Sequence, residues 1–419
     1  MFFKKVFIMT NGCPENRIDV ARTINFLESK QYAIVDNCRE ADLLLFNTCA
    51  LTQTSEDLSV KMIEQLKSQK KAGHPLFVYG CLPKININRL REVYDGTIFE
   101  SDDIQELCKI LGTETNSHDY YANYLVPRTE RISNDLTCVR NLKDILNFDS
   151  IFLNLMAKYH INLSQVIHVS RPHSYCIKIS TGCLGLCTFC AVRLSRGRVR
   201  SKTIENIKKE FEEGLEKGYK EFALLGTDLG AYGRDIGISL VPLLRELVKY
   251  EGDYEIRLRN IQPRFLKKML PDLMEILETG KISFLSSAAE SGNNRILKLM
   301  NRMYTIEEYK QNIKTINDNF PEIFVRTQLM VGFPSETDEE FQDTYNLLDE
   351  LRLDYAEVYN YQTRPNTKAF SMESPVPQDV AVRRETKLLK KSLVNEFQRK
   401  RKALKQYKVS VNKHSNLTD

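Results

Sequence analysis

The chain has 419 residues, of which 42% are hydrophobic and 27% are charged, and its formal net charge is +5. This length exceeds one ordinary core and predicts two or three domains, while the composition is typical of a soluble globular protein. No run approaches the roughly 20 consecutive apolar residues of a membrane-spanning helix, and the first twelve residues do not form a secretory signal. We therefore expect a cytoplasmic protein without a membrane partner, whose ten cysteines are metal ligands or buried thiols rather than disulfides.

Residues 1–111 alternate short apolar runs with helical patterns. Strands are predicted at residues 5–10, 32–36, 42–47, 75–79 and 97–99, and helices at residues 16–30, 56–70, 84–94 and 102–111. Strands that alternate with helices in this way form a parallel sheet with helices on both faces. The N-terminal segment is therefore predicted to be a doubly wound α/β domain.

Residues 112–172 interrupt this alternation. The part before residue 133 is polar and rich in turn-forming residues, and residues 142–159 carry apolar side chains at helical spacing. We expect an inter-domain insertion that contains one or two helices.

A second alternating series occupies residues 173–375. Its strands are predicted at residues 175–180, 221–225, 254–259, 281–286, 323–331 and 354–362, and its helices at residues 203–217, 239–250, 264–277, 293–300, 305–319 and 336–351. Six strand–helix units are too few for an eight-fold barrel, so a partial (β/α)6 barrel is predicted. Its chemistry is expected at the carboxyl ends of the strands.

Residues 376–419 are predicted to form a basic helix. Between residues 383 and 413 there are twelve Lys or Arg and two Glu, and Leu389, Leu393 and Phe397 form an apolar stripe. Two interpretations stay open, namely a helix that binds phosphates and a solvated helix that packs its stripe on the barrel.

Three cysteines follow the first strand of the second series. Cys183, Cys187 and Cys190 stand four and three residues apart, so their thiolates can converge from a single loop. Three ligands to a four-iron cluster leave one iron open to a small molecule, whereas zinc sites favour paired C-x-x-C motifs and four protein ligands. The spacing therefore predicts a 4Fe-4S cluster with one open iron.

Three further cysteines each follow a predicted strand of the N-terminal domain. These are Cys13, Cys49 and Cys81, after the first, third and fourth strands. Because the carboxyl ends of parallel strands lie at one edge of the sheet, three thiols distant in sequence meet there. The alternative is three buried thiols that act as small hydrophobes. We favour a second cluster.

The C-x-x-x-C-x-x-C motif, with Phe189 before its last cysteine, resembles the hallmark of the radical-SAM superfamily. The resemblance implies that S-adenosylmethionine chelates the open iron, and that its reductive cleavage yields a 5′-deoxyadenosyl radical that removes hydrogen from an unactivated C–H bond. It makes Cys183, Cys187 and Cys190 the catalytic centre. It also implies cofactor contacts from the superfamily's later strand ends, which correspond to Gly226, Thr227, Asp228 and Gly332, and from Phe189.

Several longer motifs resemble those of the radical-SAM methylthiotransferases. The N-terminal motifs T-x-G-C-x-x-N-x-x-D, A-D-x-x-x-x-N-T-C and G-C are matched at residues 10–19, 41–49 and 80–81. Residues 196–202, 291–305 and 331–337 resemble the family motifs of the central domain. The likeness covers about residues 4–111 and 173–370.

This resemblance implies an enzyme with two 4Fe-4S clusters that replaces C–H by C–S–CH3. One S-adenosylmethionine methylates a sulfur at the cluster of Cys13, Cys49 and Cys81, and a second is cleaved at the other cluster. The family's substrates are N6-modified adenosines next to the tRNA anticodon and an aspartate side chain of a ribosomal protein. We favour tRNA as the partner, and an external one-electron donor such as flavodoxin or ferredoxin is implied.

Three departures from the family pattern leave the substrate open. Glu290 stands where the family has a neutral glutamine expected to touch the cofactor, and Gly226-Thr227-Asp228 replaces G-Q-N. The chain also has the basic helix where typical members have a β-rich module that binds RNA or protein.

Two alternatives to tRNA methylthiolation remain. The first is the same chemistry on a ribosomal protein or peptide, or another radical-SAM outcome on a small molecule. The second is a non-catalytic iron–sulfur protein that binds RNA. Three ligands rather than four argue against this second alternative.

Overall fold

The computed structural model describes residues 5–99, 104–114, 121–128 and 174–415, with side chains up to residue 398. These residues fall into two compact units. The first contains the described parts of Met1–Cys138, Ser170–Ser283 and Gln362–Met372, and the second contains those of Phe284–Tyr361 and Glu373–Asp419. The helix predicted over residues 142–159 lies outside the described residues, and the domain boundaries expected near residues 111, 172 and 375 stay predictions.

The first unit begins with a five-stranded parallel sheet in the order β2-β1-β3-β4-β5. Its elements are β1 (Lys5–Thr10), α1 (Pro14–Ser29), β2 (Ala33–Ile34), β3 (Leu43–Thr48), α2 (Gln53–Gln69), β4 (Leu76–Gly80), α3 (Leu82–Ile85), α4 (Ile87–Arg91), β5 (Ile98–Phe99) and α5 (Ile104–Leu111). The chain winds outward from β1 to β2 and then in the opposite direction from β3 to β5. The predicted doubly wound sheet is confirmed.

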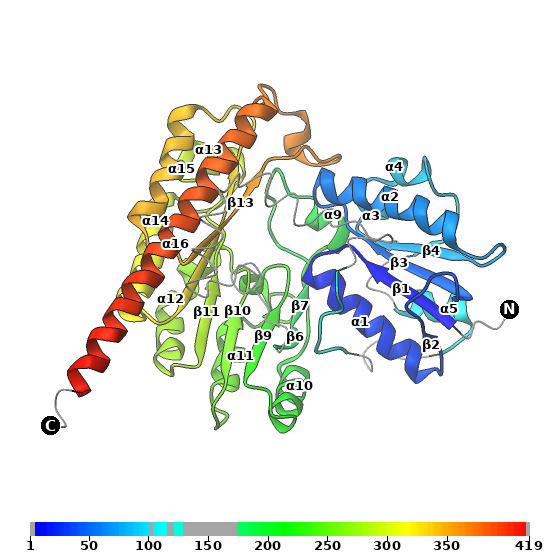
Figure 1. The fold of residues 1–419 in the computed structure, drawn as a ribbon, viewed down its shortest axis with the longest axis horizontal. Helices are drawn as coiled ribbons and strands as arrows, with labels where there is room; N and C mark the ends of the chain where they lie inside the picture. Colours follow the sequence, from blue (N-terminus) through cyan, green and yellow to red (C-terminus); the bar gives the residue numbers. More distant parts are fainter. Residues whose placement is uncertain (1–4, 100–103, 115–120, 129–173, 416–419) are drawn as a thin grey trace. The chain divides into compact units, whose positions relative to one another are not determined.

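Helices cover both faces of this sheet (Figure 1). On β3 the side chains alternate, so that Leu43 and Leu45 join the core under α1 and α5, whereas Leu44 and Phe46 join the core under α2. Both sets of side chains are fully buried. The double burial explains why the first four residues of this strand, Leu43 to Phe46, are all apolar with no polar alternation.

The second strand series begins in the same unit. Its elements are β6 (Tyr175–Lys178), β7 (Ser180–Thr181), α9 (Val192–Arg196), β8 (Arg200–Ser201), α10 (Ile204–Glu216), β9 (Glu221–Leu225), η1 (Leu229–Ala231), α11 (Leu240–Leu247), β10 (Glu255–Leu258) and α12 (Pro263–Glu278). Strand β9 pairs in parallel with β6 and with β10. The short antiparallel pair of β7 and β8 and the helix α9 were not predicted.

The second unit continues the alternation. Strand β11 (Ile282–Ser286), which crosses the division between the units, pairs in parallel with β12 (Phe324–Val331), and β12 pairs with β13 (Tyr355–Asn360). The helices are α13 (Asn294–Leu299), α14 (Ile306–Asn319) and α15 (Asp338–Glu350). Both α14 and α15 start with a Thr and Glu capping box, which fixes where each begins. Together with β6, β9 and β10, these strands give the six parallel strand–helix units that were predicted.

One long helix, α16 (Gln378–Ser415), ends the described chain, as predicted. Its first half packs within the second unit, where Leu388 and Leu393 are buried and Arg384 forms ion pairs with Glu336 and Asp338. Of the predicted stripe, Leu393 is buried, whereas Leu389 and Phe397 are half-buried. Packing of this half of the helix is thus confirmed, and phosphate binding stays a prediction. In the described part of the chain, no helix has the length and apolar character needed to cross a membrane.

Candidate metal centres

The N-terminal cysteines lie at the carboxyl edge of the first sheet. Cys13 precedes α1, Cys49 directly follows β3, and Cys81 directly follows β4. The strand register places Thr48 opposite Gly80, so Cys49 and Cys81 leave neighbouring strands at the same level. Cys13 and Cys49 flank the point between β1 and β3 where the winding reverses, which is where doubly wound sheets bind ligands.

Two buried asparagines fix the backbone around these thiols. The Asn16 side-chain oxygen lies 3.9 Å from the Cys13 Sγ and 3.8 Å from the Cys81 Sγ, so both sulfurs contact one amide group. The Asn16 Nδ2 donates to the Thr48 carbonyl at 3.1 Å, and the Asn11 Oδ1 accepts from the Cys49 N–H at 2.9 Å. The loops that follow three strands are therefore tied together.

The three thiols lie within each other's electrostatic field. Burial raises the pKa of Cys81 to about 12, Arg196 opposes this rise, and Cys49 and Cys13 add to it. Burial also raises the pKa of Cys13, with further increases from Glu15 and Cys49 and an opposing effect of Arg196. Because metals bind thiolates, a cationic cluster would supply the charge that deprotonates this set.

Thiolates are the ligands that iron–sulfur clusters take in proteins. Among the described residues, no group of three or more His, Cys, Asp or Glu side chains has the geometry to hold a metal ion. A four-iron cubane is larger than one ion and takes thiolates at separate corners, so its ligands stand further apart. Three thiols at one sheet edge are compatible with it.

The second set of cysteines occupies one loop between β7 and α9. Cys183 is buried, and its sulfur accepts hydrogen bonds from the Gly185 N–H at 3.1 Å and from the Gln262 Nε2 at 3.5 Å. Burial raises the pKa of Cys183 to about 11, and Asp228 raises it further. The Cys190 N–H donates to the Cys187 carbonyl, which closes a tight turn. Phe189 is half-buried in this turn.

Gly185 leaves space between two of these sulfurs. A Cβ atom at this position would lie 3.2 Å from the Cys183 Sγ, 3.6 Å from the Cys187 Sγ and 2.9 Å from the Gln262 Nε2. A side chain here would occupy volume directly against the thiols. The loop therefore fits a group that is held against Cys183 and Cys187.

The segment after β9 supports this loop. The Asp228 carboxylate is buried and accepts from the N–H groups of Gly230 and Gln262, which fixes the start of α12. The Thr227 hydroxyl accepts from the Gly182 N–H at 3.2 Å and donates to Glu15 at 2.8 Å. Gly226 is buried against Ser180. Their contacts with a cofactor stay predictions.

A buried ion network connects the two cysteine regions. Arg196, at the end of α9, and Lys178, on β6, each lie 2.6 Å from a carboxylate oxygen of Asp19 on α1. Arg196 also donates to the Asn16 side chain. Burial would raise the pKa of Asp19, but Lys178 and Arg196 outweigh it and lower that pKa. Arg196 is therefore held in a buried salt bridge with Asp19.

The other predicted cofactor contacts lie in the second unit. Glu290 has a positive φ of 63°, and burial raises its pKa while Arg302, at 3.6 Å, opposes the rise. Gly332 has a φ of 73°, and its N–H donates to the Glu336 carboxylate at 2.7 Å. Their cofactor contacts also stay predictions.

Three contacts to the cysteine loops were not expected from the sequence. Gln262, Asn11 and Glu15 reach Cys183, Cys49 and Thr227 respectively. The position of Gln262 in the short loop between β10 and α12 was an available signal, because ligands in parallel α/β folds collect in the loops at strand ends. Asn11 and Glu15 each stand two residues from Cys13, inside the family motif of residues 10–19.

The fold and the three-cysteine loop define a radical-SAM enzyme. The family described as the Radical SAM superfamily matches residues 177–348, and the uncharacterized protein family UPF0004 matches residues 5–99. Among solved structures, the radical S-adenosylmethionine methyltransferase TsrM from Kitasatospora setae has a TM-score of 0.58 at 12% identity, over 92% of this chain and 85% of its own. This likeness supports the fold alone. The superfamily uses S-adenosylmethionine and a 4Fe-4S cluster.

Curated relatives identify the family within this class. The threonylcarbamoyladenosine tRNA methylthiotransferase MtaB of Aquifex aeolicus is 32% identical over 90% of this chain and 85% of its own length. The ribosomal protein uS12 methylthiotransferase RimO of Thermodesulfovibrio yellowstonii is 30% identical over 95% of this chain and 84% of its own length. The chain belongs to the radical-SAM methylthiotransferases, and it is a transferase of the type that acts on tRNA or on a ribosomal protein.

Proposed function

We propose that this enzyme carries two 4Fe-4S clusters, one on each cysteine set, and methylthiolates an N6-modified adenosine of tRNA. The observation that carries the proposal is that both cysteine sets belong to one compact unit and are bridged by side chains. Glu15, two residues after Cys13, contacts Thr227, which in turn contacts Gly182 next to Cys183. Arg196, six residues after Cys190, contacts Asn16, whose oxygen faces the Cys13 and Cys81 sulfurs.

Each set has a distinct role in this proposal. The loop of Cys183, Cys187 and Cys190 holds the cluster at which S-adenosylmethionine is cleaved, with one electron from an external donor such as flavodoxin or ferredoxin. When bound, this pair supplies the radical that removes hydrogen from the substrate carbon. Cys13, Cys49 and Cys81 hold the sulfur-donor cluster, and Arg196 offsets part of the negative charge that thiolates bring to a buried site.

tRNA is the favoured substrate because several relatives are named threonylcarbamoyladenosine tRNA methylthiotransferases. Those of Pyrococcus horikoshii and Aquifex aeolicus match over 87% and 90% of this chain. Twelve Lys or Arg lie between residues 383 and 413, and those other than Arg383, Arg384 and Lys391, which form ion pairs with carboxylates, offer cationic groups for a phosphate backbone. The second candidate is a ribosomal protein, because the uS12 methylthiotransferase of Thermodesulfovibrio yellowstonii is 30% identical over 95% of the chain.

Iron analysis of anaerobically reconstituted protein tests the two-cluster arrangement. The wild type is expected to hold about eight iron atoms per chain. Replacement of Cys13, Cys49 and Cys81 by alanine should halve that content while 5′-deoxyadenosine formation continues. Replacement of Cys183, Cys187 and Cys190 should also halve it and abolish 5′-deoxyadenosine. The matched control replaces the buried thiols Cys38, Cys108 and Cys176. If the first variant keeps the full iron content, the second cluster does not exist.

Mass spectrometry of tRNA nucleosides tests the substrate. Cells without the gene should lack one methylthio-adenosine, and the wild-type gene should restore it while the Cys183→Ala variant should not. An unchanged nucleoside profile, together with loss of a methylthio group from a ribosomal protein, would replace tRNA by the second candidate.

A further inference from the structure

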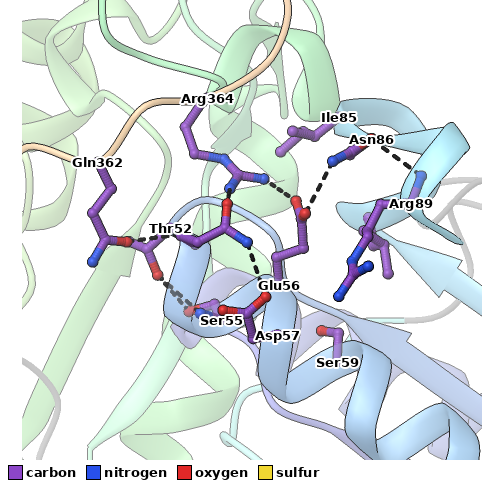
Figure 2. Close-up of polar contacts among 12 residues, drawn as sticks. Thr52, Ser55, Glu56, Asp57, Ser59, Ile85, Asn86, Arg89, Gln362 and Arg364 are labelled. Carbon is purple, nitrogen blue, oxygen red and sulfur yellow. Dashed lines mark hydrogen bonds and ion pairs between the residues drawn. The ribbon is translucent and has the colours of Figure 1, made fainter.

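The segment Gln362–Met372, called the strap here, belongs to the first unit although it follows β13 of the second. Its first residue contacts helix α2. The Gln362 Oε1 accepts from the Gln53 N–H at 2.7 Å, and the Gln362 Nε2 donates to the Thr54 hydroxyl at 3.3 Å. Figure 2 shows Gln362 against the first turn of α2, close to Thr52 and Ser55. This helix starts four residues after Cys49, so the strap touches the element that continues from the N-terminal cysteine edge.

Arg364 anchors the strap through a buried ion pair. Its guanidinium contacts the Glu56 carboxylate, and the two side chains are only 1% and 2% exposed. A second guanidinium nitrogen donates to the Gln53 Oε1 at 3.0 Å. The Glu56 carboxylate also accepts from the Asn86 Nδ2 at 2.9 Å, and Asn86 lies between α3 and α4 (Figure 2). Glu56 thus joins the segments that follow Cys49 and Cys81, and Arg364 is fixed to that junction.

The strap then reaches the loop of the other cysteine set. The Asn366 Nδ2 lies 3.4 Å from the carbonyl of Ile85 at the end of α3. The Thr367 hydroxyl and N–H both donate to the Arg364 carbonyl, which closes a turn before η2 (Lys368–Ser371). The buried Ala369 N–H donates to the Thr188 carbonyl at 2.8 Å, and Thr188 lies between Cys187 and Cys190. One short segment therefore contacts α2, α3 and the three-cysteine loop in succession.

We propose that Arg364 is a positioning residue that, through the strap, keeps the loop of Cys187 and Cys190 in fixed register with the sheet edge of Cys49 and Cys81. The inference rests on the proposed function, because it gives the strap the role of fixing the spacing between two clusters. Methylthiolation needs the sulfur and the substrate carbon to meet in one geometry, and a displacement of about 1 Å can cost about a hundredfold in rate.

An ion pair suits this role better than an apolar contact. An apolar side chain at position 364 could slide along α2, because hydrophobic contact is not directional. A guanidinium that bonds Glu56 and Gln53 at once has one low-energy position, since any other register leaves a buried carboxylate without its cation. The pair therefore selects one register of the strap.

The test compares Arg364→Met, Glu56→Gln and Arg364→Lys with the wild type. Lys220→Met is the matched control, because Lys220 forms an ion pair with Asp253 on the surface of the same unit. Hydrogen exchange of the cluster-free proteins reports on the Ala369 amide and on the residues of β3 and β4. In the reconstituted holoenzymes, the molar ratio of methylthio product to 5′-deoxyadenosine reports on coupling. A strap with a purely structural role would lower both products together and leave this ratio unchanged.

In Arg364→Met we expect the Ala369 amide to exchange about tenfold faster, while β3 and β4 keep wild-type protection. The product ratio should fall about tenfold or more, with 5′-deoxyadenosine still formed. Arg364→Lys should recover part of both losses, and Lys220→Met should match the wild type. If Arg364→Met also speeds the exchange of β3 and β4, the test relies on Glu56→Gln instead, because the amide of glutamine has the same shape as the carboxylate.

Unchanged exchange at Ala369 in both Arg364→Met and Glu56→Gln overturns the proposal, and so does faster exchange with an unchanged product ratio. Failure of the proposed function has a different signature. In that case the wild type itself would bind only about four iron atoms per chain or form no methylthio product. The exchange of Ala369 would still respond to Arg364→Met.

Discussion

The two cysteine sets of the first unit are assembled in different ways. Cys13, Cys49 and Cys81 come from the ends of three strands and meet only when the sheet has formed in its correct register. Cys183, Cys187 and Cys190 come from eight consecutive residues and are brought together by one turn. The first set therefore depends on tertiary structure, whereas the second depends mainly on local chain geometry.

The surroundings of the two sets differ accordingly. The first is framed by buried polar and charged side chains from distant segments, including Asn16 and Asp19 with their cations from β6 and α9. The second is framed mainly by its own backbone, by Gln262 and by the short segments that carry Thr227, Asp228 and Ala369. Loss of the Asp19 carboxylate should therefore damage the first set more than the second, and steric perturbation of the turn should damage the second. The following variants test this difference.

Asp19→Asn should have the largest effect. It leaves Lys178 and Arg196 buried without their carboxylate, which typically costs about 3–5 kcal/mol. Urea unfolding at pH 7 should show this loss of stability, and the iron bound by the N-terminal set should fall. The control, Asp253→Asn, removes an exposed carboxylate from the same unit and should leave both quantities unchanged.

The comparison of the wild type with Asp19→Asn also gives a prediction about pH. The pKa of Asp19 is lowered in the folded state, so its stabilising contribution is complete above the ordinary carboxyl pKa of about 3.9. That contribution is lost as the pH falls further, through the lowered pKa. The stability difference between the wild type and Asp19→Asn should thus be constant from pH 7 to about pH 5 and shrink below pH 4. A difference that grows in acid would contradict the role of the ion network.

Gly80→Ala and Gly185→Ala should each affect a different cysteine set. Gly80 has a φ of 100°, and a Cβ there would lie 2.5 Å from the Thr48 carbonyl oxygen, so alanine should cost about 2–3 kcal/mol and displace Cys81. Gly185 has an ordinary φ, so alanine there should change stability little and crowd Cys183. Iron analysis should show loss from the N-terminal set in the first variant and from the loop set in the second. Loss of the same cluster in both would remove the distinction between the sets.

Gln262→Leu should have the smallest effect. It removes one hydrogen bond to the Cys183 sulfur and keeps the volume of the side chain, so the loss should be about 1 kcal/mol, or roughly fivefold in cluster affinity. Iron release from the loop set under increasing chelator concentration measures this change. Equal weakening of the N-terminal set would show that Gln262 acts through the fold rather than through Cys183.

The first sheet and the positions of Cys13, Cys49 and Cys81 were predictable from the sequence because the longer strands β1, β3 and β4 are compact apolar runs. The positions of Cys183, Cys187 and Cys190 were predictable from their spacing. Breaks within the predicted helices and strands were harder to predict from the sequence. Residues 84–94 were predicted as one helix, but Asn86 adopts a φ of −144° and caps α4, which divides the segment into α3 and α4. The pair of β7 and β8 has two residues in each strand, too few to show an alternating pattern.

Arg364 illustrates what sequence patterns cannot provide. Nothing in its neighbourhood distinguishes it from the many exposed arginines of the chain, and its partner Glu56 lies about 300 residues earlier. Its burial follows from where the strap returns to the first unit, which is a property of the tertiary fold. The same holds for Arg196, whose partner Asp19 is far away in sequence although both lie in motifs of the family.

The order of synthesis gives the buried carboxylates an additional significance. Asp19 and Glu56 leave the ribosome long before the cations that neutralise them, Lys178, Arg196 and Arg364. At a synthesis rate of about 5–20 residues per second, roughly 15–60 s pass between the synthesis of Glu56 and that of Arg364. During this interval water must solvate the carboxylates. The nascent N-terminal sheet can therefore form its strands, but Asp19 and Glu56 cannot yet be buried. Cluster insertion into that sheet should therefore follow, rather than precede, synthesis of the strap.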